Sequence, residues 1–255
     1  MRIFDKSLIM DFVTYLLLII PLAIAPGIAI ALFIYFRDKY EKEPFRLLLG
    51  CFLFGILSIV PAALIEMGEG MLGFDETGGM VEVLLFAFIG VGLVEELSKF
   101  FFVRVFAYPK KAFNEPFDGI VYSVMVAMGF ATAENILYAV QHGLGTTVIR
   151  LFTAVPLHAT CGIIMGFYLG LAKFRPGPFR YIFLGILLAT LIHGAYDFFL
   201  MQQDYPALVI MAFVSLAAAV TLSFIAIRNH QKRSPFVNAP APDDQDTKLP
   251  GGQAN

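Results

Sequence analysis

Seven long runs of apolar residues constrain this chain more than any other feature of its sequence. They lie at about 12–36, 45–66, 81–106, 117–140, 148–172, 179–201 and 206–227. Each is about as long as the roughly 20 residues that a helix needs to cross the hydrocarbon core of a bilayer. Lipid cannot hydrogen-bond a free backbone amide, and none of the runs alternates like a barrel strand, so each is predicted to be a helix. The predicted fold class is all-α: a polytopic integral membrane protein, a bundle of about seven transmembrane helices.

The composition supports this prediction and excludes other classes. Of the 255 residues, 58% are apolar and 15% are charged, whereas soluble domains have about 45–50% and about 25%. The spans leave no room for a separate soluble domain. A net charge of −2 without a dense basic block gives no reason to expect a nucleic-acid partner. Cys51 and Cys161 both fall inside apolar runs, so we expect packing residues rather than disulfides or zinc-finger ligands.

The basic residues of the connections predict the orientation in the cell membrane. One set of connections, with the carboxyl-terminal segment, carries 14 Lys and Arg residues, and the opposite set carries 3. Because basic residues stay on the cytoplasmic side, the amino terminus is predicted outside and the carboxyl terminus in the cytoplasm. The first run continues to Phe36, beyond a signal-peptide core, and is predicted to be retained. Residues 1–235 form the predicted transmembrane domain, and 236–255, rich in Pro, Gly and Asp, form a predicted disordered tail.

Four successive predicted helices carry acidic or imidazole side chains at membrane depth. A charge at the bilayer centre costs about 2.5–3.5 kcal/mol, so each such residue needs a partner or a function. The residues are Glu95, Glu96 and Lys99, then Glu134, then His158, then His193 and Asp197. Taken singly, each of these residues has a structural explanation. Glu95 and Lys99, one turn apart, can form an ion pair within their helix, Glu134 with Asn135 can hold two helices together, and a single histidine can be a packing residue. Six separate explanations are less economical than one shared functional site near the midplane or in the outer half.

Histidine and carboxylate donors that leave one ligand position to water describe a catalytic divalent metal such as zinc. A further carboxylate can then take the proton of that water. Asp197, one turn from His193, can accept the second ring N–H of this histidine or bind the metal directly. Glu95 and Glu96 differ by about 100° around their helix and cannot point identically at one target.

The motifs of other intramembrane proteases are absent from the sequence: it contains no Gly-x-Ser-x-Gly, Gly-x-Gly-Asp or His-Glu-x-x-His. It contains instead four motifs in order. They are Glu95-Glu96-x-x-Lys99, Phe130-x-x-x-Glu134-Asn135, His158 after Pro156, and His193-x-x-x-Asp197. From about residue 26 to 200, this combination resembles the PrsW family of intramembrane proteases, relatives of the CAAX-prenyl endopeptidases and the Abi/CPBP membrane proteins.

The resemblance implies an endopeptidase with a helical-bundle fold and a membrane-anchored protein substrate in a lipid environment. In that family the best-known activity is the first, extracytoplasmic cut of an anti-sigma factor. The resemblance also implies that Glu95, Glu96, His158 and His193 are the catalytic residues. The candidate metal ligands are Glu134, His158, His193 and Asp197. Glu134 stands where the CAAX-type relatives have His, and Asp197 where they have Asn, so a glutamate-activated water held by histidines without a metal stays open.

Two other functional classes fit a membrane protein of this kind. Carboxylate and histidine chains also mark the proton pathways of transporters and channels. The sequence shows no repeat relating its two halves, however, and the acids and histidines gather on the third to sixth predicted helices. A non-enzymatic membrane scaffold is the third class, and it would not need the whole set of acids and histidines.

Overall fold

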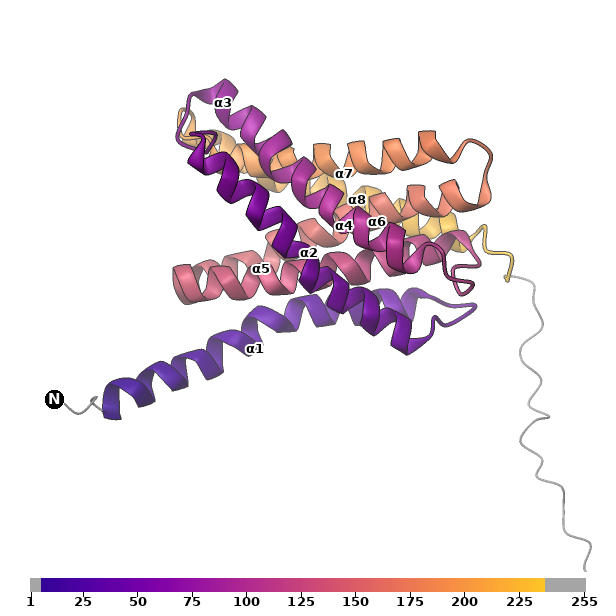
Figure 1. The fold of residues 1–255 in the computed structure, drawn as a ribbon, viewed down its shortest axis with the longest axis horizontal. Helices are drawn as coiled ribbons and strands as arrows, with labels where there is room; N and C mark the ends of the chain where they lie inside the picture. The colour runs from indigo at the N-terminus through magenta and orange to yellow at the C-terminus, as the bar shows by residue number, and fades with distance from the viewer. Residues whose placement is uncertain (1–5, 237–255) are drawn as a thin grey trace, which may run out of the picture.

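The computed structural model describes residues 6–236, and every regular element within them is a helix (Figure 1). The elements are α1 (Lys6–Arg37), α2 (Phe45–Met71), α3 (Met80–Leu85), η1 (Phe86–Leu93), α4 (Val94–Phe102), η2 (Val103–Ala107), α5 (Pro116–Phe152), α6 (Ala154–Phe174), α7 (Pro178–Met201), η3 (Pro206–Leu208) and α8 (Val209–Gln231). The predicted all-α bundle is confirmed. The predicted tail lies outside the described residues from 237 onward.

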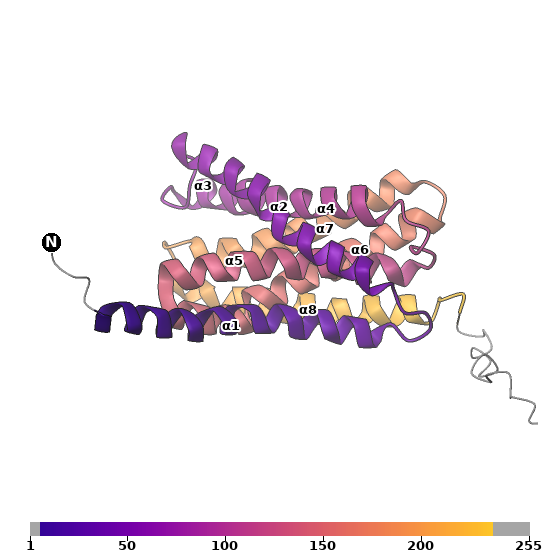
Figure 2. The same ribbon diagram turned by 60° about the horizontal axis from the view of Figure 1, so that its bottom comes forward.

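Six helical segments of the described chain are long and apolar enough to cross a membrane: α1 from Leu17, α2, α5, α6, α7 and η3 with α8. The remaining predicted span, which carries Glu95, Glu96 and Lys99, is divided into shorter helical segments. The structure builds it from α3, η1, α4 and η2, which follow one another without a break and extend beside α2 (Figures 1 and 2). The π-helical turns η1 and η2 flank α4 on both sides. π-Helical turns are rare in proteins, and those that occur often lie at functional sites.

The centre of the bundle is formed by α5 and α6, which are mostly buried. α1, α2 and α6 pack against α5, while α7 and α8 pack against α6. Small residues allow these close approaches: a Cβ atom on Gly129 of α5 would lie 2.0 Å from the carbonyl oxygen of Phe52 in α2. On the other side of α5, a Cβ atom on Gly119 would lie 2.3 Å from the carbonyl oxygen of Gly166 in α6. The glycines therefore permit close helix packing, as in other membrane proteins.

The chain reverses its direction within α5. Gly143 has φ 79° and ψ −168°, which is non-helical backbone, and the residues on both sides of it are helical. Positive φ suits glycine because it has no Cβ atom. The limb after Gly143 returns toward the limb before it, since Arg150 Nε donates a hydrogen bond to Asn135 Oδ1. Thr153 separates this returning limb from α6. The predicted spans at 117–140 and 148–172 correspond to the two sides of this turn.

The connections gather at two ends of the bundle (Figure 1). The basic end carries the connections 38–44, 108–115 and 175–177, and the opposite end carries 72–79, the turn at Gly143 and 202–205. At the basic end, one carboxylate oxygen of Asp118 accepts the backbone N–H groups of Asn114 at 2.7 Å and Glu115 at 2.8 Å. Asp118 therefore stabilises the amino terminus of α5, as a carboxylate in a first helical turn does.

Candidate active site

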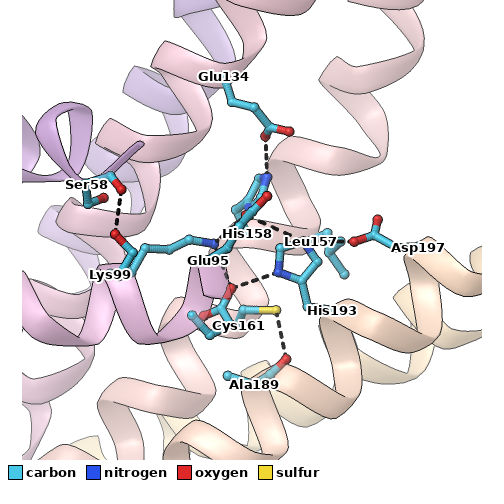
Figure 3. Close-up of polar contacts among 12 residues, drawn as sticks. Ser58, Glu95, Lys99, Glu134, Leu157, His158, Cys161, Ala189, His193 and Asp197 are labelled. Atoms are coloured by element: carbon cyan, nitrogen blue, oxygen red, sulfur yellow. Dashed lines mark hydrogen bonds and ion pairs between the residues drawn. The ribbon is translucent and has the colours of Figure 1, made fainter. Parts of the chain in front are cut away.

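Glu95 of α4, His158 of α6 and His193 of α7 converge inside the bundle (Figure 3), and Glu96 of α4 joins them. One ligand atom from each of these four residues lies within 4.8 Å of all the others. We call these four residues the inner group. All four side chains are buried, and Glu95 has the largest exposed fraction, 4%. Three segments far apart in the sequence, α4, α6 and α7, thus place their acids and imidazoles together, as one shared site requires.

The ammonium group of Lys99 neutralises part of this negative charge. Its Nζ lies 3.1 Å from Glu95 Oε2, 2.7 Å from Glu96 Oε1 and 3.2 Å from His158 Nδ1. It also lies 4.3 Å from the centroid of the Phe130 ring, a distance at which a cation is attracted to an aromatic face. The ion pair between Glu95 and Lys99 therefore exists, but Lys99 belongs to a larger network.

Both glutamates of α4 reach the inner group, although they leave the helix in different directions. Glu96 Oε1 lies 2.9 Å from His193 Nδ1, and Glu95 Oε2 lies 3.7 Å from His193 Nε2. The two carboxylates thus face different atoms of the same imidazole. Their long side chains compensate for the angle between them around α4.

Glu134 and Asp197 lie beside the histidines and outside the inner group. Glu134 Oε2 is 2.7 Å from His158 Nε2, so His158 turns its other nitrogen, Nδ1, toward Lys99. Asp197 Oδ2 is 3.2 Å from His193 Nε2. Carboxylates in this position commonly hold the ring of a metal-binding histidine in a fixed orientation. The sequence placed both acids at the site, and the structure puts each against one imidazole.

The inner group has the chemistry of a metal site. It offers two imidazoles and two carboxylates, which are zinc ligands in proteins. In addition, Glu96 Oε2 is buried and has no hydrogen-bond partner among the described residues. A buried carboxylate oxygen without a partner is costly, and a bound cation would remove that cost. The residues present therefore fit a divalent metal.

A cavity of about 720 Å³ connects the inner group with the end of the bundle opposite the basic end. Glu95, His158 and His193 line its inner part, and the exposed residues Glu76 and His142 line its outer part. The side chains between them come mainly from α2, α5 and α7. Glu96 and Lys99 are not part of the lining, so Glu95 is the glutamate of the inner group that faces the cavity.

Arg150 is a site residue that the sequence did not reveal. Its charge counted only as one of the few basic residues of the outer connections, whereas in the structure it lines the cavity and pairs with Glu134. No helical periodicity links residues 134 and 150, because the chain reverses between them at Gly143. A reversal centred on residue 143 does place position 150 opposite position 135 or 136, but the sequence alone does not fix the centre of the turn.

Residues 43–225 match the family described as PrsW family intramembrane metalloprotease. Protease PrsW of Geobacillus kaustophilus (strain HTA426) is 39% identical to the chain over 190 residues, which are 73% of this chain and 81% of that protein. The chain belongs to the PrsW family. The resemblance seen in the sequence is thereby confirmed, and the protein is an intramembrane protease.

Two other PrsW relatives show how far the similarity extends. Protease PrsW of Bacillus subtilis (strain 168) is 39% identical over 184 residues, covering 71% of this chain and 82% of the relative. Protease PrsW of Clostridioides difficile (strain 630) is 32% identical over 230 residues, covering 85% and 94%. No solved structure matches the chain. The residues that match the PrsW family include all of the inner group.

Proposed function

We propose that the protein hydrolyses a peptide bond of a membrane-anchored protein. Glu95, His158 and His193 form the proposed active site. The cavity carries this proposal, because it joins these three buried residues to exposed residues at one end of the bundle. Hydrolysis inside a membrane needs a path for water and space for an extended stretch of substrate. A cavity of about 720 Å³ that reaches the inner group offers both.

Glu95 is the proposed general base, since it is the glutamate of the inner group that faces the cavity. It takes a proton from the attacking water and can return it to the leaving amine. Lys99 Nζ lies 3.1 Å from Glu95 Oε2, and this ion pair keeps the carboxylate in place. His158 and His193 hold the water or its metal, and Glu134 and Asp197 fix the orientation of the two rings.

The proposed metal is zinc, which Glu96, His158 and His193 would hold. Two imidazoles and one carboxylate with a free position for water are a donor set of catalytic zinc sites. When bound, the metal supplies a Lewis acid that lowers the pKa of its bound water to about 7. If the two histidines instead hold the water directly, Glu95 keeps the same role. Removal of the metal by a chelator separates these two versions.

The proposed substrate is a protein with a single membrane span, cut near its extracytoplasmic end. The basic end of the bundle is predicted to face the cytoplasm, and the cavity reaches the opposite end. Membrane-anchored anti-sigma factors, the substrates that the family resemblance implies, are the first candidates. The proposed location is the cell membrane, with the amino terminus outside and the carboxyl terminus in the cytoplasm.

A cleavage assay with purified full-length protein in detergent tests the proposed function. Candidate single-span substrates are incubated with the protein alone, with a chelator, and with a chelator followed by excess Zn²⁺. We expect cleavage that the chelator stops and Zn²⁺ restores. Cleavage that resists exhaustive chelation would remove the metal from the proposal. Absence of cleavage with every single-span substrate, together with proton-coupled uptake in liposomes, would favour a transporter.

A further inference from the structure

Arg150 reaches the site through a chain of polar contacts. Its Nη2 lies 2.6 Å from Glu134 Oε2, and its Nε donates a hydrogen bond to Asn135 Oδ1 at 2.9 Å. Glu134 Oε2 also lies 2.7 Å from His158 Nε2. The carboxylate of Glu134 is therefore shared between a guanidinium group and an imidazole of the inner group.

We propose that Arg150 is a positioning residue that fixes Glu134, and through Glu134 the ring of His158. This inference rests on the proposed function, in which His158 holds the water or its metal. A carboxylate that accepts the Nε2–H of His158 selects the tautomer whose Nδ1 is free. That Nδ1 faces the inner group, 3.2 Å from Lys99 Nζ. Without Arg150, the carboxylate of Glu134 would be free to turn toward the cavity that it lines.

The guanidinium group suits this task better than an ammonium group. Its planar fork holds its nitrogens in fixed directions, so Nε can donate to Asn135 while Nη2 forms the ion pair with Glu134. The carbon at its centre lies 3.9 Å from the centroid of the Tyr138 ring, and this stacking adds a third constraint on the plane of the fork. The side chains of Arg150 and Glu134 are only 13% and 15% exposed, so water screens their ion pair less than it screens a surface pair.

The fold explains how a residue so far along the chain arrives at this position. Gly143 reverses the chain at the end opposite the basic end, and the returning limb of α5 brings Arg150 back against Asn135. After Thr153 the chain begins α6, which carries His158. Arg150 thus joins the two limbs of the hairpin next to the histidine that it serves.

Steady-state kinetics on the full-length protein test the proposal. Arg150→Met is expected to lower kcat by about 10–100-fold, the usual loss for partners of a ligating histidine, and to leave KM unchanged. Arg150→Lys is expected to recover part of the loss, because an ammonium group can bind Glu134 but lacks the fork. Arg180→Met is the matched control, since Arg180 is exposed at the start of α7. Its kcat is expected to equal that of the wild type.

A double-mutant comparison shows whether Arg150 acts through Glu134. Once Glu134→Gln has removed the carboxylate, Arg150→Met or Arg150→Lys is expected to cause no further loss of kcat. Losses that multiply in the double variant would overturn the proposal. If Arg150→Met does not fold, Arg150→Lys with and without Glu134→Gln gives the same comparison.

NMR of ¹⁵N-histidine-labelled protein in detergent provides a readout that does not depend on activity. In the wild type, His158 is expected as a single tautomer with its proton on Nε2, and in Arg150→Met as a mixture of tautomers. An unchanged His158 spectrum in Arg150→Met would overturn the proposal. If the wild type cleaves no substrate, the proposed protease site fails, while the His158 spectra still decide the role of Arg150.

Discussion

Each imidazole of the inner group contacts at least one carboxylate. His158 has Glu134 at its Nε2, and His193 has Glu96 at Nδ1 and Asp197 at Nε2. Lys99 is the lysine of this network, and it contacts both glutamates of α4. These contacts give each ionisable side chain of the network at least one opposite charge or hydrogen-bond partner. At the scale of single residues, the site is a network of charges. Removing one charged side chain leaves a specific neighbour without its partner.

Lys99→Met tests whether this network stabilises the fold. It leaves Glu95 and Glu96 buried without their cation, and uncompensated buried charges typically cost about 3–5 kcal/mol of unfolding free energy. We expect a clearly lower melting temperature in detergent, and partial recovery when Glu96→Gln is added. Arg104→Met is the control, since Arg104 lies in η2, directly after α4, and is exposed. An unchanged melting temperature for Lys99→Met would contradict the network.

Three buried carboxyl groups at the basic end predict how stability depends on pH. Burial raises the pKa of Asp38 to about 7, that of Glu115 to about 7 and that of Glu43 to about 10. The folded protein therefore keeps these groups protonated, whereas the unfolded chain releases their protons from about pH 4 upward. Stability is expected to fall as pH rises from about 4 to about 7, with Glu43 extending the loss toward about 10.

Melting curves between pH 5 and pH 8 check this dependence. Asp38→Asn and Glu115→Gln are expected to flatten the fall in melting temperature, because amides have no proton to release. A melting temperature that rises with pH over this range would contradict the assignment of these carboxyl groups.

At the scale of elements, the sequence predicts helices well because lipid leaves few alternatives to them. The runs of apolar residues predicted each span, and spacing by four residues correctly paired Glu95 with Lys99 and His193 with Asp197. The π-helical turns around α4 were not predictable, because they change hydrogen bonding without changing the apolar pattern. Arg150 was missed for a related reason: its position depends on where the chain reverses, which is a property of tertiary structure.

The crossing of α2 and α5 gives a test of the packing. Gly129→Ala places a Cβ atom 2.0 Å from the carbonyl oxygen of Phe52, so the two helices must move apart. Overpacking of this kind typically costs about 1–3 kcal/mol, and we expect a lower melting temperature. Gly145→Ala in the same helix is the control, because a Cβ atom there meets no other atom within 4 Å. Equal melting temperatures of the two variants would contradict this close crossing.

At the scale of the whole molecule, the bundle has a basic end and an end toward which the cavity opens. Both native cysteines, Cys51 and Cys161, are buried, so single cysteines introduced into the connections can report the orientation. A membrane-impermeant maleimide is expected to label Thr77→Cys in intact cells and to label Lys110→Cys only after lysis. Labelling of Lys110→Cys in intact cells would contradict the orientation and move the proposed cut to the cytoplasmic side.

The central claim, that Glu95 activates the water for peptide hydrolysis, is tested most directly by Glu95→Gln. Glutamine keeps the size of the side chain but cannot accept the proton of water, so kcat is expected to fall by about 10²–10⁴-fold. Lys99 keeps its contact with Glu96 at 2.7 Å, so the melting temperature is expected to stay near that of the wild type. Cleavage and melting are measured on the same preparation. Early melting of Glu95→Gln, with cleavage restored by adding Lys99→Met, would contradict the claim and make Glu96 the base.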